Sequence, residues 1–478
     1  MTRIRHLTDA VETLLRESGD QLPRATRQRL VMFVVGVLLA GTIVLRRVAT
    51  TQTHIGLGTA QAASHERRLR RILNDAQLGQ AVPMYGRVVR RVLRRLRTGQ
   101  RVWLILDESG HSDVVRVLLA AWWYRGRAVP LAWVLWPAQQ PHDQTYWQDC
   151  EHLLSQVAAI LPPGLQVTVL ADRAFGCPGF TDLVVAQGWT YLVRVQGQTR
   201  LRHADGTEQP FQSLLPAAGT RWCGSGHAFK KQGWRAVRVV ASWRVPCREP
   251  LLLVSNLPPS WDLVRQYRLR AAIEALFRDW KTSGWQWEAS QVRDVAHQAV
   301  LVLVLALATL VTLVLGEEAA QAILAQPAQT GRRRPWHARD SLVRLGRDRL
   351  WQRIWQDDAS PLTWELAHVD APNWSTECWH AAQPAADPVF ITGRVGKREH
   401  LRQVAEHHHH DTPVLSAPKP PPGGRVWEGV ARPGRMVIPS VSGRAAWTAD
   451  VRMSIPIGET ITAPGGRAGG TCASQEPP

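Results

Sequence analysis

The sequence has little cysteine, and no arrangement of it suggests a fixed site. Six cysteines occur in 478 residues, and no two form a C-x-x-C pair. A disulfide framework or a zinc site is therefore not expected, because both use cysteines at recognisable spacings. No secretory signal pattern begins the chain, so we expect a protein of a reducing cytoplasm.

Acidic residues are also scarce relative to basic ones. The chain has 39 Asp and Glu against 58 Lys and Arg, a formal net charge of +19 and a sequence pI of about 10.8. A protein this basic usually binds a polyanion, either nucleic acid or an anionic membrane surface. The alternative is a basic surface that serves solubility alone.

Long hydrophobic runs are missing as well. The two longest cover residues 31–45 and 299–315, and both are shorter than the roughly 20 residues that a spanning helix needs. We expect helices buried in a large core and no stable membrane association. A membrane protein with helices at these two places is the competing hypothesis.

The residue patterns divide the chain into six parts. We predict a helical, basic, DNA-binding region at 1–100, a mixed α/β sheet domain in two parts at 101–196 and 262–320, a β-rich insertion at 197–261, a helical region at 321–371 and a tail of low order at 372–478. In the first part, Arg87–Arg97 places arginines along one helix face, which could bind phosphates or simply be solvated. In the tail, the histidine run 407–410 is not expected to be a functional metal site.

Two predicted strands lead into acidic residues. VWLILD ends at Asp107 and QVTVLAD ends at Asp172. Ligand sites of α/β sheets gather at the ends of strands, and two carboxylates could share a pair of Mg²⁺ ions for phosphodiester chemistry. Glu108 follows Asp107, but adjacent strand residues face opposite ways, so only one of them can point at the metal ions.

A third acid lies on the helix predicted after the insertion. On a helical wheel of YRLRAAIEALFRDWK, one stripe carries Tyr267, Arg270, Glu274, Arg278 and Lys281. Taken alone, this stripe could be an ordinary solvated face with i,i+4 ion pairs.

The spacing Tyr-x2-Arg-x3-Glu-x6-Lys resembles the Y-R-E-K signature of bacterial insertion-sequence transposases of the IS-four type. VWLILDES resembles that family's first-Asp strand, VLADRAF its second-Asp strand and TYLVRV its next strand. The family also has a β-rich insertion between its second Asp and its Glu. The resemblance covers about residues 50–320 and implies an RNase H-like catalytic domain.

The resemblance implies a DDE transposase that cleaves element ends and joins them to target DNA. Asp107, Asp172 and Glu274 would be catalytic and would hold two Mg²⁺ (or Mn²⁺) ions, while Tyr267, Arg270, Arg278 and Lys281 would contact DNA. Its partners would be double-stranded DNA, as terminal inverted repeats and target, and a second subunit in the synaptic complex. The protein would work in the bacterial cytoplasm, at the nucleoid. A catalytically inactive or domesticated DNA-binding copy is the alternative.

Two further roles stay open on the sequence. Arg173 could be structural or could steady Asp172. Some family members stack a flipped base on a tryptophan of the insertion, a role for which Trp222, Trp234 and Trp243 are candidates. They could equally be core or surface tryptophans, in a chain that contains 22.

Overall fold

A computed structural model describes residues 2–366 except 20, 57–59, 141, 143–144, 283 and 326–339. The predicted low-order tail at 372–478, with its histidine run, lies outside the described residues.

The N-terminal region is helical, as predicted. Its helices are α1 (Thr2–Glu17), α2 (Arg24–Ala40), α3 (Leu45–His54), α4 (Ala62–Leu73), α5 (Ala76–Gly79) and α6 (Val82–Val92). The apolar run 31–45 is not one helix, because Gly41 ends α2 in the left-handed conformation, with φ of 63°. The chain then bends by 89° into α3.

Five strands and two helices form the first part of the sheet domain. They are β1 (Arg101–His111), β2 (Val115–Tyr124), β3 (Arg127–Pro137), α7 (Tyr146–Ile160), β4 (Gln166–Ala171), α8 (Pro178–Ala186) and β5 (Thr190–Arg194). The strand order is β3-β2-β1-β4-β5, with β2 antiparallel to its neighbours and β1, β4 and β5 parallel to one another. Helix α7 lies in the connection that leads to β4, and α8 connects β4 to β5, since parallel strands need a crossover connection.

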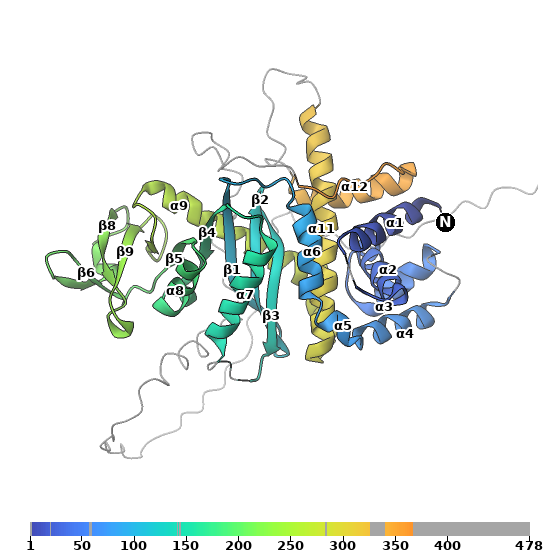
Figure 1. The fold of residues 1–478 in the computed structure, drawn as a ribbon, viewed down its shortest axis with the longest axis horizontal. Coiled ribbons are helices and arrows are strands. Elements are labelled where there is room, and N and C mark those ends of the chain that lie inside the picture. The colour runs from blue at the N-terminus through green and yellow to red at the C-terminus, as the bar shows by residue number, and fades with distance from the viewer. Residues whose placement is uncertain are drawn as a thin grey trace, which may run out of the picture. The chain divides into compact units, whose positions relative to one another are not determined.

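The predicted β-rich insertion extends this sheet. Its strands are β6 (Arg200–Arg202), β7 (Glu208–Pro210), β8 (Arg221–Ala228), β9 (Arg235–Ser242) and β10 (Leu251–Ser255). Strand β10 pairs with β5, and the order continues β10-β9-β8-β6-β7, so the ten strands form one mixed sheet (Figure 1). The predicted class, a mixed α/β sheet flanked by helices, is confirmed.

The chain returns from the insertion through a helical segment with an irregular turn. This segment comprises α9 (Trp261–Tyr267), the 3₁₀ turn η4 (Arg268–Arg270) and α10 (Ala271–Lys281). The turn η5 (Trp287–Ser290) leads to the long helix α11 (Val295–Ala325), and α12 (Leu342–Gln356) follows.

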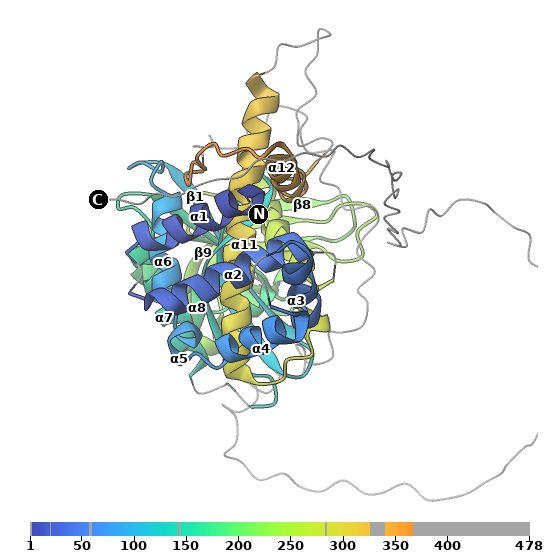
Figure 2. The ribbon, with the colours of Figure 1, turned by 90° about the vertical axis from the view of Figure 1, so that its right-hand side faces the viewer.

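Helix α11 lies between the sheet and the N-terminal helices. It contacts β3 on one side and α2, α4 and α5 on the other (Figure 1), and Figure 2 shows the N-terminal helices in front of it. By length and composition it could cross a membrane, but the side chains of its apolar part are almost all buried inside the protein. The run 299–315 thus lies in a buried core helix, as predicted.

Candidate active site

Asp107 and Asp172 lie side by side on neighbouring parallel strands. The ladder between β1 and β4 ends with the pair Leu106 and Ala171, and the two aspartates are the next residues of their chains. Adjacent strands are about 4.8 Å apart, so their backbones are in reach of one shared ligand. The prediction that this strand ends at Asp107 is wrong. Strand β1 continues to His111, because it still pairs there with β2.

The side chains of these two aspartates are held by backbone amides. Asp172 accepts a hydrogen bond of 2.8 Å from the Ala174 N–H and so caps the 3₁₀ turn η1 (Arg173–Phe175). Asp107 is 6% exposed and accepts a hydrogen bond of 3.0 Å from the Glu108 N–H.

Arg270 connects Asp107 to Glu274. Its Nη1 lies 3.0 Å from Asp107 Oδ2, and its Nη2 donates to Glu274 Oε1. Because one planar guanidinium makes both contacts, the two carboxylates lie within about 8 Å of each other. Burial lowers the pKa of Arg270, but Asp107, Tyr267, Glu274 and Asp172 together raise it well above its ordinary value. The structure therefore joins Asp107 and Glu274 through one arginine, and the register of β1 and β4 sets Asp172 beside Asp107.

Tyr267 is buried beside the same group. The 3₁₀ turn η4 follows it directly, and residues three apart in such a turn eclipse each other, which aligns Tyr267 with Arg270 more closely than a straight α-helix would. Burial raises the pKa of Tyr267 to about 12, with further contributions from the charges of Asp172 and Asp107 and an opposing one from Arg270. The phenol stays protonated at neutral pH and can donate a hydrogen bond.

Lys281 and Arg278 lie further along α10. Lys281 ends the helix, and its Nζ is 3.5 Å from Glu288 Oε1. Seven residues separate it from Glu274, which is about 10 Å of helix. Arg278 is exposed. The structure thus groups Tyr267 and Arg270 with the acids, while these two cations extend the same helix away from them.

Polar contacts in the core set the position of the Glu274 helix. Asp279 of α10 pairs with Arg127 of β3 at 3.2 Å, and both side chains are 20% exposed. The Trp280 ring donates to Thr309 of α11 at 2.9 Å. Because the two contacts join α10 to two different elements, they restrict the rotation of α10 about its axis and its position relative to the sheet.

The donor set agrees with a hard divalent cation, since it consists of carboxylate oxygens without sulfur. Over the part of the chain that the structure describes, however, no three His, Cys, Asp or Glu residues are grouped closely enough to hold a metal ion as they stand. Between Asp107 and Glu274 lies the Arg270 guanidinium, which pairs with both and sets one positive charge against their two negative ones. A cation shared by these acids would require the Arg270 side chain to leave at least one of them.

One further charged residue, Arg194, lies beside the acids. Arg194 ends β5, and the ladder between β4 and β5 reaches the pair Ala171 and Val193, so Arg194 lies next to Asp172. Arg194 and Arg173 both pair with Glu249. The strand TYLVRV was predicted, but its arginine could be placed only once the neighbouring strand and the register were known.

The three insertion tryptophans are half-buried and differ in their contacts. The Trp222 ring lies against Gly224, where a Cβ atom would come within 2.7 Å of it. Trp243 donates to the Cys247 carbonyl at 2.9 Å. Trp234 lies under the guanidinium of Arg202, whose Cζ is 4.6 Å from the ring centroid. A stacking role for any of them stays a prediction.

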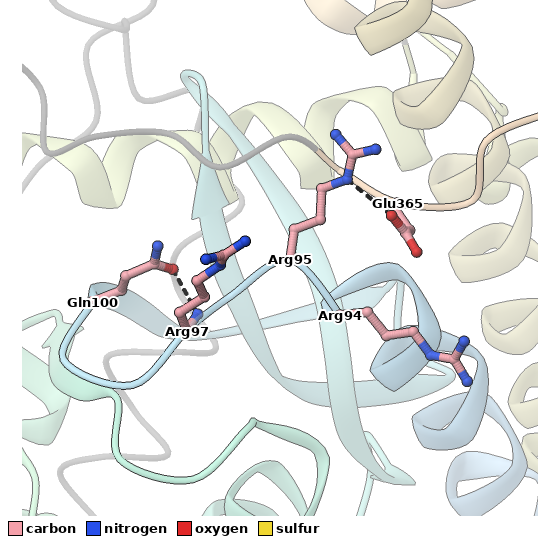
Figure 3. Close-up of a pocket in the computed structure, with 5 residues that line it drawn as sticks. All are labelled: Arg94, Arg95, Arg97, Gln100 and Glu365. Carbon is pink, nitrogen blue, oxygen red and sulfur yellow. Dashed lines mark hydrogen bonds and ion pairs between the residues drawn. The ribbon is translucent and has the colours of Figure 1, made fainter.

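A basic hollow follows the predicted arginine helix. Helix α6 ends at Val92 rather than continuing to Arg97, and the next residues line a cavity of about 680 Å³ (Figure 3). Arg95 pairs with Glu365 at 2.9 Å, and the Arg97 N–H donates to the Gln100 side chain. Arg94 completes the lining. These arginines therefore project from a loop and not from a continuous helix face.

One comparison with known protein families finds a match. Residues 124–311 match the family model for the transposase DDE domain, which is less than half of the chain. The match includes Asp172 and Glu274 and begins after Asp107. No curated protein matches the sequence. Among solved structures, a piggyBac transposase synaptic complex with hairpin DNA is similar, at 9% identity and a TM-score of 0.41, over 75% of this chain and 80% of that chain.

Proposed function

We propose that this protein is a DDE transposase that cleaves the ends of a DNA element and joins them to a target. The observation that carries the proposal is the parallel register of β1 and β4, which aligns Asp107 with Asp172, together with the tie of Glu274 to Asp107 through Arg270. The DDE-domain match over residues 124–311 supports it. The order β3-β2-β1-β4-β5 supports an RNase H-like catalytic domain of the type found in IS-four transposases.

Asp107, Asp172 and Glu274 would hold two Mg²⁺ or Mn²⁺ ions, which supply an activated oxygen nucleophile and stabilise the leaving oxygen. The protein's own groups position the DNA. Arg270 would exchange its carboxylate contacts for a phosphate, which accepts the same paired N–H donors. Tyr267 would donate from a phenol that burial keeps protonated. Arg278 and Lys281 would contact phosphates further along the strand.

The basic N-terminal region would hold the terminal inverted repeats. Its charge would steer the protein to DNA, and the arginines that line the hollow in Figure 3 would contact the DNA backbone. Because two ends must be brought together, the working form would be a homodimer. We place it in the bacterial cytoplasm, at the nucleoid, without stable membrane association.

Cleavage of DNA that carries the flanks of the coding region tests this function. Wild type is expected to cut at the element boundary with Mg²⁺ and to lose this activity with EDTA, and Asp172→Asn is expected not to cut. Asp182→Asn is the matched control, because Asp182 lies on α8 in an exposed ion pair with Arg235. Equal cutting by wild type and Asp172→Asn would remove Asp172 from the mechanism.

A DNA-binding protein without catalysis is the second candidate. One observation favours it, namely that Arg270 forms ion pairs with two of the three acids. Specific binding to the flanking DNA without cleavage in Mg²⁺, Mn²⁺ or any other divalent ion would establish it.

A further inference from the structure

Two arginines converge on a single carboxylate oxygen beside the acids. Arg173 Nη1 lies 3.3 Å and Arg194 Nη2 lies 3.1 Å from Oε2 of Glu249. The same Arg194 nitrogen also donates to the Pro250 carbonyl at 3.2 Å, which holds its side chain in place. Two guanidinium groups are thus directed at the position of one anionic oxygen.

This position borders the candidate active site. Arg173 directly follows Asp172, and the register of β4 and β5 sets Arg194 next to Asp172. The charge of Arg194 also reaches Tyr267, where it opposes the rise in pKa that burial causes. An anion held by the two arginines would therefore lie next to the acids and the phenol.

Glu249 is held weakly in this position. Its side chain is 60% exposed, and those of Arg173 and Arg194 are 42% and 27% exposed. It belongs to the loop between β9 and β10, where residues 244–249 are all exposed. Exposed ion pairs contribute little, because water screens them. The buried pair of Arg270 and Asp107, with side chains 15% and 9% exposed, is a different case.

A phosphate is the stronger ligand for such a pair of arginines. Its oxygens can accept paired N–H donors from both guanidinium groups at once, a geometry that arginine matches and lysine does not. We infer that Arg173 and Arg194 form a binding site for one phosphate of the DNA backbone, and that Glu249 occupies this site until DNA displaces it. The identity of the ligand as DNA rests on the proposed function, but its recognition requires no cleavage.

The test is binding of a labelled duplex carrying the flank of the coding region, measured by fluorescence anisotropy in Ca²⁺ over a range of salt concentrations. Glu249→Gln is expected to bind about two- to fivefold more tightly, the factor that an exposed ion pair represents. Arg194→Gln and Arg173→Gln are each expected to bind more weakly, and the double variant is expected to reduce the salt dependence by about one phosphate contact. In the Arg173→Gln/Arg194→Gln background, Glu249→Gln is expected to have no effect.

Arg235→Gln is the matched control, since Arg235 begins β9 of the insertion and makes an exposed ion pair with Asp182. It is expected to bind as wild type does. Weaker or unchanged binding by Glu249→Gln, or a double arginine variant with the affinity and salt dependence of wild type, would overturn the inference.

The outcomes separate this inference from the proposed function. If the variants bind as expected but wild type cuts no DNA, the phosphate site stands and the cleavage proposal fails. If wild type cuts DNA but the variants bind as wild type does, the cleavage proposal stands and the phosphate site fails.

Discussion

Replacing Arg270 with methionine tests how the acids are held together. The change removes the positive charge and both contacts, to Asp107 Oδ2 and Glu274 Oε1, and keeps most of the aliphatic stem. Breaking a buried ion pair from one side costs about 3–5 kcal/mol, because the remaining charge is left without its partner. Asp107 keeps the Glu108 N–H, so we expect the lower end, about 3 kcal/mol. Glu274, with a side chain that is 44% exposed, should add little.

The assay is the urea-unfolding free energy in metal-free buffer. Arg265→Met is the matched control, since Arg265 pairs with Asp262 through side chains that are 48% and 54% exposed, and its loss should cost about 0–1 kcal/mol. The double variant Asp107→Asn/Arg270→Met is expected to lose less than the sum of the two single variants, because no charge is then stranded. Adding Mg²⁺ should stabilise Arg270→Met more than wild type, since a cation can replace the lost charge.

A loss of stability in Arg270→Met no larger than that in Arg265→Met would contradict this role of Arg270. Additive effects of the single variants in the double variant would contradict it as well. Either result would mean that the guanidinium does not compensate a buried carboxylate.

Two further predictions concern the scaffold. Gly346→Ala should destabilise the protein by about 3 kcal/mol or more in thermal or urea unfolding, because its Cβ would come within 1.9 Å of the Thr312 carbonyl oxygen where α12 crosses α11. The control Gly79→Ala should be tolerated, since the nearest atom to its Cβ would be 3.9 Å away. Equal stability of both variants would contradict this packing. Burial raises the pKa of all five tyrosines, to about 12 for Tyr191 and Tyr267. Because the folded pKa values exceed the ordinary 10, stability should be intact below pH 10 and fall as pH rises towards 12. Phenolate absorbance at 295 nm should therefore appear only above pH 10 and together with unfolding, and a phenol that titrates at pH 10 in the folded protein would contradict the burial.

The sequence predicted the parts of the fold that local patterns determine. Buried strands read as apolar runs, so the strands before Asp107 and Asp172 were found, and helical periodicity located the segment that carries Glu274. The wheel also put Arg270 and Glu274 on one stripe, and the structure pairs them. The long apolar run near residue 300 was interpreted as a buried helix, which α11 is.

What the sequence did not predict depends on pairing between distant segments. The length of β1 past Asp107 follows from its ladder with β2, which no pattern within β1 reveals. The contact of Arg270 with Asp107 joins residues 163 positions apart. Arg194 gains its place from the register of β4 and β5. The bend after Gly41 depends on one left-handed residue inside an apolar run, where glycine was not interpreted as a helix end.

The most direct test of the acid cluster is the binding of Mn²⁺ by electron paramagnetic resonance in the presence of flank DNA. Two tightly bound ions are expected per wild-type subunit, because three carboxylates and a phosphate supply the oxygens. Asp172→Asn is expected to lose this binding, while Asp182→Asn retains it. Equal numbers and affinities of bound Mn²⁺ in wild type and Asp172→Asn would contradict the claim that these acids form a cation site.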